Sequence, residues 1–270
     1  MAEVVHLAGV YRRLLGAHVR SQLQYRTSLA LQLVAVFIST SLDFIVILVL
    51  FDQVPALSGW TLEEVAFLYG ISAIAFAVCD IGIGHLDLLP RMIRDGTFDL
   101  VLVRPLGSLF QIAASDFALR RFGKLAQGGL VLGFAVARLD VDWTAGRVAM
   151  TVLAVVTGAV IFAAVWIALA TVAFWIVDAI EFVNGFTYGG SYLTQYPVSL
   201  FGPWVRRLLA FVVPMAFVCY FPALYVLDKP DELGLPHWFR FGSPFVAAAT
   251  ILAAGLAWRT AVHHYRSAGG

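Results

Sequence analysis

Charged residues are scarce in this sequence: Asp, Glu, Lys and Arg together make up 13% of its 270 residues. Soluble domains carry about 25%. Hydrophobic residues reach 61%, and the mean hydropathy is +0.86. A core of this size cannot bury so much apolar surface, so the composition predicts a protein that has lipid as its solvent. The net charge of +1 gives no general attraction for nucleic acid, and no nucleic-acid partner is expected.

Cysteine is rare as well. Cys79 and Cys219 each lie inside an apolar run, without the spacing of a disulfide framework or a metal site. They are expected to be small buried hydrophobic residues. His263 and His264 are adjacent rather than four residues apart, which makes them a poor metal-binding pair on a helix. The sequence therefore predicts no metal centre.

Motifs for catalysis are missing. Gly123-Lys124 is followed by Leu125, and no glycine stands five residues before Gly123, so this is not a P-loop. Residues 189–193 (GGSYL) lack the closing glycine of a nucleophile elbow. The chain is therefore predicted to be non-enzymatic and to hold no cofactor. Intramembrane charge is expected to be limited mainly to Asp43, and no transporter-type internal repeat is evident.

Long apolar runs dominate what is present. About 20 such residues cross the hydrocarbon core of a bilayer. The predicted spans are Ser28–Phe51, Glu63–Gly84, Leu125–Ala137 with a helix start near Ser108, Ala149–Val177, a fifth between Asp178 and Asp228, and Phe245–Trp258. The first run begins late, is too long for a signal-peptide core and has no cleavage pattern after it, so no cleaved signal is expected.

The fifth span has two interpretations. Hydropathy favours Leu208–Leu227, because Phe182–Phe201 is polar for a membrane helix. Pro197, Pro203, Pro214 and Pro222 nevertheless interrupt this part of the chain. Backbone broken by proline is tolerated at membrane depth where protein or a watery cavity satisfies it. A re-entrant helical pair after the fifth span is the alternative that explains these prolines.

The distribution of Lys and Arg sets the expected orientation. Residues 5–23 read as an amphipathic helix in the membrane interface, and the second loop is rich in Arg. The hydropathy interpretation places 14 of the 18 basic residues on the side of the membrane that carries the N-terminus and 4 on the other side. If Arg206 and Arg207 lie outside, the division is 12 to 6. Both counts predict cytoplasmic N- and C-termini.

One polar stretch between the apolar runs stands out. Residues 92–106 (MIRDGTFDLVLVRPL) contain a turn signal at Asp95-Gly96 and a helix-ending Arg104-Pro105 pair. A short charged element between glycine and proline is expected to be stiff and exposed. The alternative is an ordinary cytoplasmic loop.

Two stretches resemble the membrane permease subunits of type-2 ATP-binding-cassette exporters. The first is residues 93–106, and the second runs from Tyr196-Pro197 through Pro203-Trp204 to Pro222-Ala223. The likeness is closest to a bacterial subfamily whose permeases are often encoded in pairs. It implies an all-α integral membrane protein of six spans, with an interfacial leader (1–27), a cytoplasmic coupling region (85–124) and an outer re-entrant segment (203–228) in one permease domain (1–270).

The resemblance also implies a division of roles. The permease would sit in the bacterial inner membrane and form half of a pathway with a second, identical or related permease. ATP and Mg would be bound by separate ATPase subunits. An ion-coupled carrier or an intramembrane enzyme that works without an ATPase is the alternative, and the cargo is not predicted.

The candidate residues fall into three sets. ATPase coupling is assigned to Arg94, Asp95, Gly96, Asp99, Arg104 and Pro105. The substrate pathway is assigned to Asp43, Asn184, Thr187, Ser191, Thr194 and Gln195, with a structural partner role as the alternative for Asp43. Helix packing is assigned to two small-residue pairs, Gly129/Gly133 and Gly185/Gly189, which would need partners.

Overall fold

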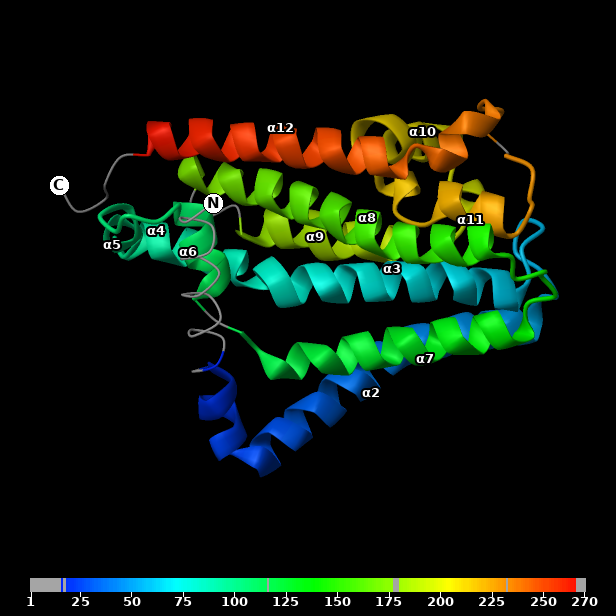
Figure 1. Ribbon diagram of the computed structural model, residues 1–270, viewed down its shortest axis with the longest axis horizontal. Helices are drawn as coiled ribbons and strands as arrows, with labels where there is room; N and C mark the ends of the chain where they lie inside the picture. Colours follow the sequence, from blue (N-terminus) through cyan, green and yellow to red (C-terminus); the bar gives the residue numbers. More distant parts are fainter. Residues whose placement is uncertain (1–15, 17, 116, 177–179, 232, 266–270) are drawn as a thin grey trace.

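The protein is seen in a computed structural model that describes residues 16, 18–115, 117–176, 180–231 and 233–265. Within these residues every named element is a helix, and an isolated bridge joins Leu57 and Trp60. The long helices lie along the longest axis of the molecule, and successive ones run in opposite directions (Figure 1). They are α2 (Arg26–Gln53), α3 (Leu62–Ile83), α7 (Phe122–Arg138), α8 (Ala145–Ala170), α9 (Ile180–Leu193) and α12 (Ser243–His264).

Short helices gather at the two ends of this bundle. One end carries α4 (Leu89–Arg94), α5 (Phe98–Leu102) and α6 (Ser108–Ala114), and is named here the α4–α6 end (Figure 1). The opposite end carries α10 (Pro203–Arg207) and α11 (Tyr220–Val226). The single-turn connections are η1 (Gly84–Leu88), η2 (Leu119–Arg121), η3 (Thr171–Phe174), η4 (Val198–Leu200), η5 (Leu208–Val212), η6 (Met215–Phe217) and η7 (His237–Phe241).

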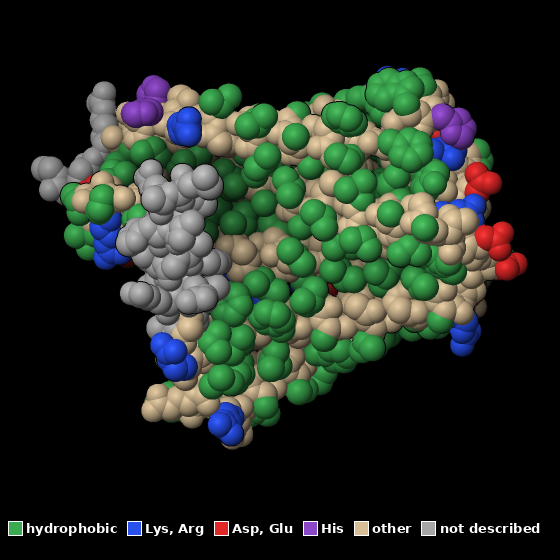
Figure 2. Space-filling view, viewed as in Figure 1, with side chains coloured by type: hydrophobic (Ala, Val, Ile, Leu, Met, Phe, Trp, Pro, Cys, Tyr) green, Lys and Arg blue, Asp and Glu red, His purple; other side chains and the backbone are tan. Residues whose placement is uncertain are grey.

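Among the described residues, four helical stretches are long and apolar enough to cross a membrane: Arg26–Gln53, Leu62–Arg94, Ala145–Phe174 and Ser243–His264. A bent pair, Pro203–Val212 and Met215–Val226, makes a fifth if it counts as one span. The helices α7 and α9 have 17 and 14 residues, fewer than the usual span. Figure 2 shows a broad hydrophobic surface over the middle of the bundle, with charged side chains towards its two ends. The chain is a multi-pass membrane protein.

Helix α3 is the centre of the bundle. Two thirds of its most apolar window is buried (67%), against 6% for α2, which is exposed to the surroundings along most of its length. Its packing against α7 depends on glycine. A Cβ on Gly70 would lie 2.8 Å from the backbone nitrogen of Leu132, and a Cβ on Gly128 would lie 3.1 Å from the backbone nitrogen of Ile74. Small residues on both helices thus let the two backbones approach closely.

The end of the molecule opposite α4–α6 is tied together by polar contacts. Thr61 and Glu64 form a capping box at the start of α3. Lys229 lies 3.0 Å from the Glu64 carboxylate, donates to the Gly59 carbonyl and sits over the Trp60 ring. The loop before α12 is therefore fastened to the loop before α3.

The prediction that the third span begins near Ser108 is wrong. The helix α6 ends at Ala114, and α7 begins only at Phe122, preceded by η2. Gln22 explains how the break is tolerated. Its side chain donates to the Phe117 carbonyl and accepts from the Leu119 amide, which satisfies backbone groups that a continuous helix would have paired.

The straight span that hydropathy favours over Leu208–Leu227 is not present. Its two halves meet at Val213-Pro214 with a bend of 74°, the geometry of either a broken span or a re-entrant loop. The predicted start of the fourth span, Ala149, is four residues too late. The helix α8 begins at Ala145, where the Thr144 side chain caps it by accepting a hydrogen bond from the Arg147 amide. The predicted leader helix lies mostly outside the described residues; residues 18–24 are helical.

Candidate functional site

The segment predicted to couple to a motor protein forms a compact corner at the α4–α6 end. Helices α4 and α5 are joined by a turn in which Gly96 has a φ of +68°, a backbone conformation that favours glycine. The helix α5 ends at Leu102, two residues before Arg104-Pro105, as the sequence predicts. Arg94, Asp95, Arg104 and Pro105 are exposed, and Asp99 is half-buried.

Phe98 fixes this corner to the bundle. Its side chain is fully buried, and its ring packs edge-on against Phe174 at 5.3 Å and Tyr265 at 5.0 Å. Phe174 in turn packs against Trp258 of α12, whose indole donates to Ser108 at the start of α6. One aromatic cluster therefore joins α5 to the ends of α8 and α12.

Polar contacts add to this attachment. The hydroxyl of Tyr265 faces the Asp99 carboxylate; burial, and then that carboxylate, raise the pKa of Tyr265, so the phenol stays protonated. Gln111 of α6 donates to the carbonyls of Val101 and Leu106, at 2.9 and 2.7 Å. The loop that contains Arg104 is thereby held at both of its ends.

An apolar patch lies on the outside of the corner. Leu100 is 61% exposed, Leu102 41% and Val103 78%. The charged side chains of Arg94, Asp95 and Arg104 are exposed in the same segment. An apolar surface rimmed by charge at the end of a stiff support is typical of a protein-binding site.

The predicted pathway residues of α9 lie mostly inside the bundle. The buried hydroxyls of Thr187, Ser191 and Thr194 donate to carbonyls of their own helix. Thr194 also lies 2.5 Å from the Ser72 hydroxyl of α3, and Gln195 is buried. Thr187 and Ser191 are therefore buried on α9, Thr194 and Gln195 directly follow it, and the assignment of all four to a pathway stays a prediction.

Asn184 and Asp43 lie elsewhere. The Oδ1 atom of Asn184 is buried, and no described donor reaches it. Asp43 of α2 is half-buried, forms a hydrogen bond with the Tyr192 hydroxyl of α9 and lies in the field of Lys124. Asp43 thus has the neighbouring-helix partners that the structural alternative requires.

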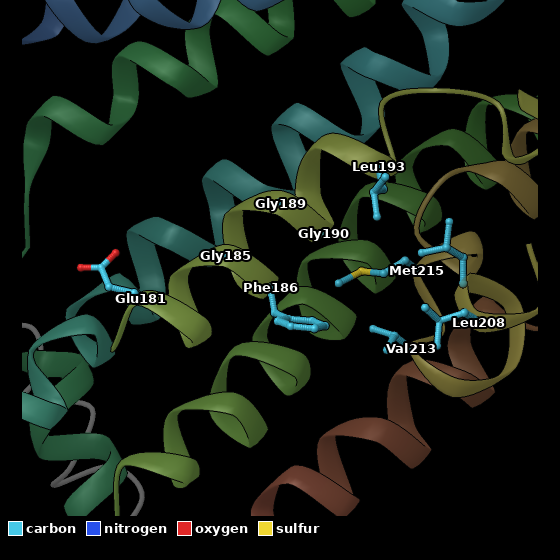
Figure 3. A pocket seen from close by; sticks show the side chains of 10 residues that line it. Glu181, Gly185, Phe186, Gly189, Gly190, Leu193, Leu208, Val213 and Met215 are labelled. Carbon is cyan, nitrogen blue, oxygen red and sulfur yellow. The ribbon is translucent and has the colours of Figure 1, made fainter. Parts of the chain in front are cut away.

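The outward side of α9 borders a groove of about 540 Å³ (Figure 3). Side chains of α9 face those of the bent pair across it, and Phe186, Val213 and Met215 gather around the space while Glu181 lies apart, near the start of α9. Gly185 and Gly189 have no described atom within 4 Å of an added Cβ, so they open the groove. The full lining is Glu181, Gly185, Phe186, Gly189, Gly190, Leu193, Leu208, Leu209, Val213 and Met215.

The other small-residue pair is also free of contacts within the described chain. Nothing lies within 4 Å of a Cβ added to Gly129 or Gly133, and both residues are exposed. The close approach of α3 and α7 uses Gly128 instead. Partners for the predicted pairs would therefore come from outside this part of the chain.

A half-buried charged cluster was missed in the sequence. Asp80 pairs with Arg121 at 3.1 Å, and Lys124 lies 4.0 Å from the centre of the Phe76 ring. Asp87 accepts from the Trp166 indole at 3.0 Å and the Tyr188 hydroxyl at 2.9 Å. The expectation that intramembrane charge is limited mainly to Asp43 is therefore too narrow. The signal was the spacing, since Asp80 and Asp87 are seven residues apart and Arg121 and Lys124 three apart, as on one helix face.

Comparison with known families decides what this membrane protein is. The family described as ABC-2 family transporter protein matches residues 37–269. The chain belongs to the ABC-2 transporter family. No curated protein and no solved structure matches it. As an ABC-2 protein it is the membrane permease component of an ABC transporter, a transport subunit in a family that is generally non-catalytic, and the family implies partnership with ABC ATPase subunits.

Proposed function

We propose that this permease is half of an exporter and that ATP hydrolysis on a separate ATPase subunit drives it through the α4–α5 corner. The observation that carries the proposal is the exposed apolar patch of Leu100, Leu102 and Val103 on a corner held by the buried Phe98. A motor can move a membrane pathway only through a contact that survives the stroke. The patch supplies the contact, and the aromatic cluster supplies the stiffness.

The route of the force follows from the contacts of Phe98. A push on α5 reaches Phe174 of η3, which continues α8, and through it Trp258 of α12. These two helices pack against each other along the bundle and extend to the opposite end (Figure 1). Rigid helices transmit displacement along their length, so movement at the ATPase would be felt at the α10–α11 end.

The proposed topology places the α4–α6 end in the cytoplasm, in agreement with the excess of Lys and Arg predicted there. The helices α2, α3, α7, α8, α9 and α12 would then be the six spans. The bent pair would be re-entrant from the outer side, which is supported by the position of α10 and α11 at one end of the bundle (Figure 1).

The proposed pathway runs along the outward side of α9, between this subunit and a second permease, and so differs from the sequence-based assignment to the buried Thr187, Ser191 and Thr194. Its groove is lined by apolar side chains except for Glu181, which suits a cargo with an apolar body. The exposed glycine face of α7 at Gly129 and Gly133 is available for close contact with the second subunit.

Coexpression with an ABC ATPase, sought first in the reading frames that neighbour the permease, tests this function. We expect copurification, ATPase stimulation, and two permeases with two ATPases in native mass spectrometry. Val103→Asp should weaken copurification at least tenfold, because it places a charge in the apolar contact. Ala56→Asp, an exposed apolar-to-acidic change at the opposite end, is the matched control. Transport by the permease alone, or unchanged copurification of Val103→Asp, would contradict the proposal.

A further inference from the structure

A polar cavity that is partly open to the surface lies between helices of the bundle, away from the groove and the α4–α5 corner. It has a volume of about 240 Å³, room for roughly eight waters at ~30 Å³ each and hence for a phosphate-sized group. The elements around it are α2, α3 with η1, η2 with α7, and α9. Its lining is Val36, Asp80, Asp87, Arg120, Arg121, Lys124 and Tyr188.

The carboxylates in and beside the cavity already have donors. The Asp80 carboxylate forms an ion pair with Nε of Arg121, at 3.1 Å. The Asp87 carboxylate accepts hydrogen bonds from two neutral groups, the indole of Trp166 and the hydroxyl of Tyr188. Asp43, which interacts electrostatically with Lys124 but is not part of the lining, accepts a hydrogen bond from the Tyr192 hydroxyl. A cation is therefore not what the cavity lacks.

Hydrogen-bond donors, by contrast, are left over. The Nη1 atom of Arg121 is buried, and no described acceptor reaches it. Lys124 contacts the face of the Phe76 ring and feels Asp80 and Asp43 electrostatically, and no hydrogen bond from its ammonium to a described residue is found. Arg120 adds a third cationic side chain to the lining. Unused donors on the half-buried Arg121 and Lys124 are matched by a group that only accepts hydrogen bonds and carries negative charge.

The backbone beside the cavity is shaped to admit these side chains. A Cβ on Gly84 would lie 2.0 Å from Oδ1 of Asp80 and 2.7 Å from Nη2 of Arg121. No other residue type could occupy this position without displacing the pair. The absence of a side chain at Gly84 therefore leaves room for the Arg121 guanidinium, whose Nη1 atom has no described acceptor.

The cavity also has a polar approach. A second cavity of about 240 Å³ is lined by His18, Ser21, Gln22, Gln32, Ala118 and Arg120. Arg120 lines both spaces, so they adjoin at its side chain. The second cavity reaches the residues before α2, which are predicted to lie in the membrane interface, the level at which phospholipid headgroups are found.

We propose that the cavity between α2, α3, α7 and α9 binds a phosphate-type anionic group through Arg120, Arg121 and Lys124. The group could be the headgroup of an anionic phospholipid or a soluble phosphate, since both offer the same oxygens. The inference does not depend on the ATPase, because it concerns the permease alone.

Binding is tested with the purified full chain in zwitterionic nanodiscs. One arm adds phosphatidylglycerol at rising mole fraction, and the other adds sodium phosphate against sodium chloride at equal ionic strength. Lipid adducts in native mass spectrometry and the thermal unfolding midpoint are read in both. Arg120→Gln removes an exposed donor that has no hydrogen bond to a described residue, so the fold should survive. Lys124→Met removes a half-buried one. Arg259→Gln, an exposed arginine near the α4–α6 end of α12, is the matched control.

We expect the wild type and Arg259→Gln to bind and be stabilised equally, and Arg120→Gln and Lys124→Met to lose about tenfold or more in affinity. An effect of phosphatidylglycerol alone identifies a lipid headgroup, and an effect of phosphate identifies a soluble anion. If neither ligand distinguishes Arg120→Gln from Arg259→Gln, the cavity holds only water and the proposal is wrong.

Discussion

Arg104 is an exposed cation at the end of a fixed corner, and no described residue accepts a hydrogen bond from it. Pro105 restricts the backbone beside it, and Gln111 holds the carbonyls of Val101 and Leu106 on either side. A guanidinium presented this way can hold a carboxylate with two parallel hydrogen bonds. The alternative is that it rests among anionic headgroups, worth about 1 kcal/mol.

We predict that Arg104→Ala leaves the permease folded and weakens ATPase docking by about 1.5–3 kcal/mol, the range for a hydrogen bond to a charged group. Arg104→Lys separates the two roles, because a headgroup contact tolerates lysine and a two-bond contact does not. Titration of the purified ATPase onto nanodisc-embedded permease gives the affinities, with Arg91→Ala on neighbouring α4 as the control. Wild-type affinity in both Arg104 variants would show that this residue has no coupling role.

At the scale of elements, the close contact of α3 with α7 decides the shape of the bundle. The chain offers two kinds of glycine on these helices. Gly70 and Gly128 have the partner backbone against them, whereas Gly129 and Gly133 face open space. The pattern G-x-x-x-G alone does not distinguish these cases, since neighbouring positions on a helix point in different directions.

We predict that Gly70→Ala destabilises the isolated permease by about 1–3 kcal/mol, because its Cβ would lie 2.7 Å from that of Leu132. Gly129→Ala is the matched control and should leave the stability of the isolated subunit unchanged. Thermal unfolding in detergent measures both. Equal effects of the two substitutions would show that the α3–α7 contact is not set by Gly70.

At the scale of the whole molecule, the bent pair α10–α11 decides whether Arg206 and Arg207 lie outside. Arg206 is a poor position for a labelling cysteine, since its guanidinium donates to the carbonyls of Phe201 and Ser199. Arg207 is exposed and suits the purpose.

We predict that Arg207→Cys reacts with an impermeant thiol reagent added to whole cells. The wild-type chain is the background, because Cys79 and Cys219 are buried and should react little. A chain that also lacks these two cysteines confirms that the label is at residue 207. Labelling that appears only after the inner face is opened would place the arginines inside and support a straight fifth crossing.

The sequence by itself determined that this protein lies in lipid, where most of its long helices are, and where the α4–α5 corner turns and ends. Helices over residues 28–51, 63–84 and 245–258 were predicted, and they are present in α2, α3 and α12, except that Gly84 already begins η1. Apolar runs of this length have one stable form in lipid, since each backbone group must be bonded within its own segment. The turn at Gly96 and the end of α5 before Arg104-Pro105 were also predictable from the sequence. Glycine and proline act through their own backbone angles, so their effect does not depend on distant residues.

Only the tertiary structure decided which side of each helix faces which neighbour. The break before α7 depends on Gln22, nearly a hundred residues away, and the inward position of Thr194 depends on Ser72. The charged cluster could not be recognised as one site, because Asp80, Arg121 and Tyr188 meet only when α3, α7 and α9 pack together. Hydropathy averages over a helix and carries no direction, whereas a site depends on where individual side chains meet.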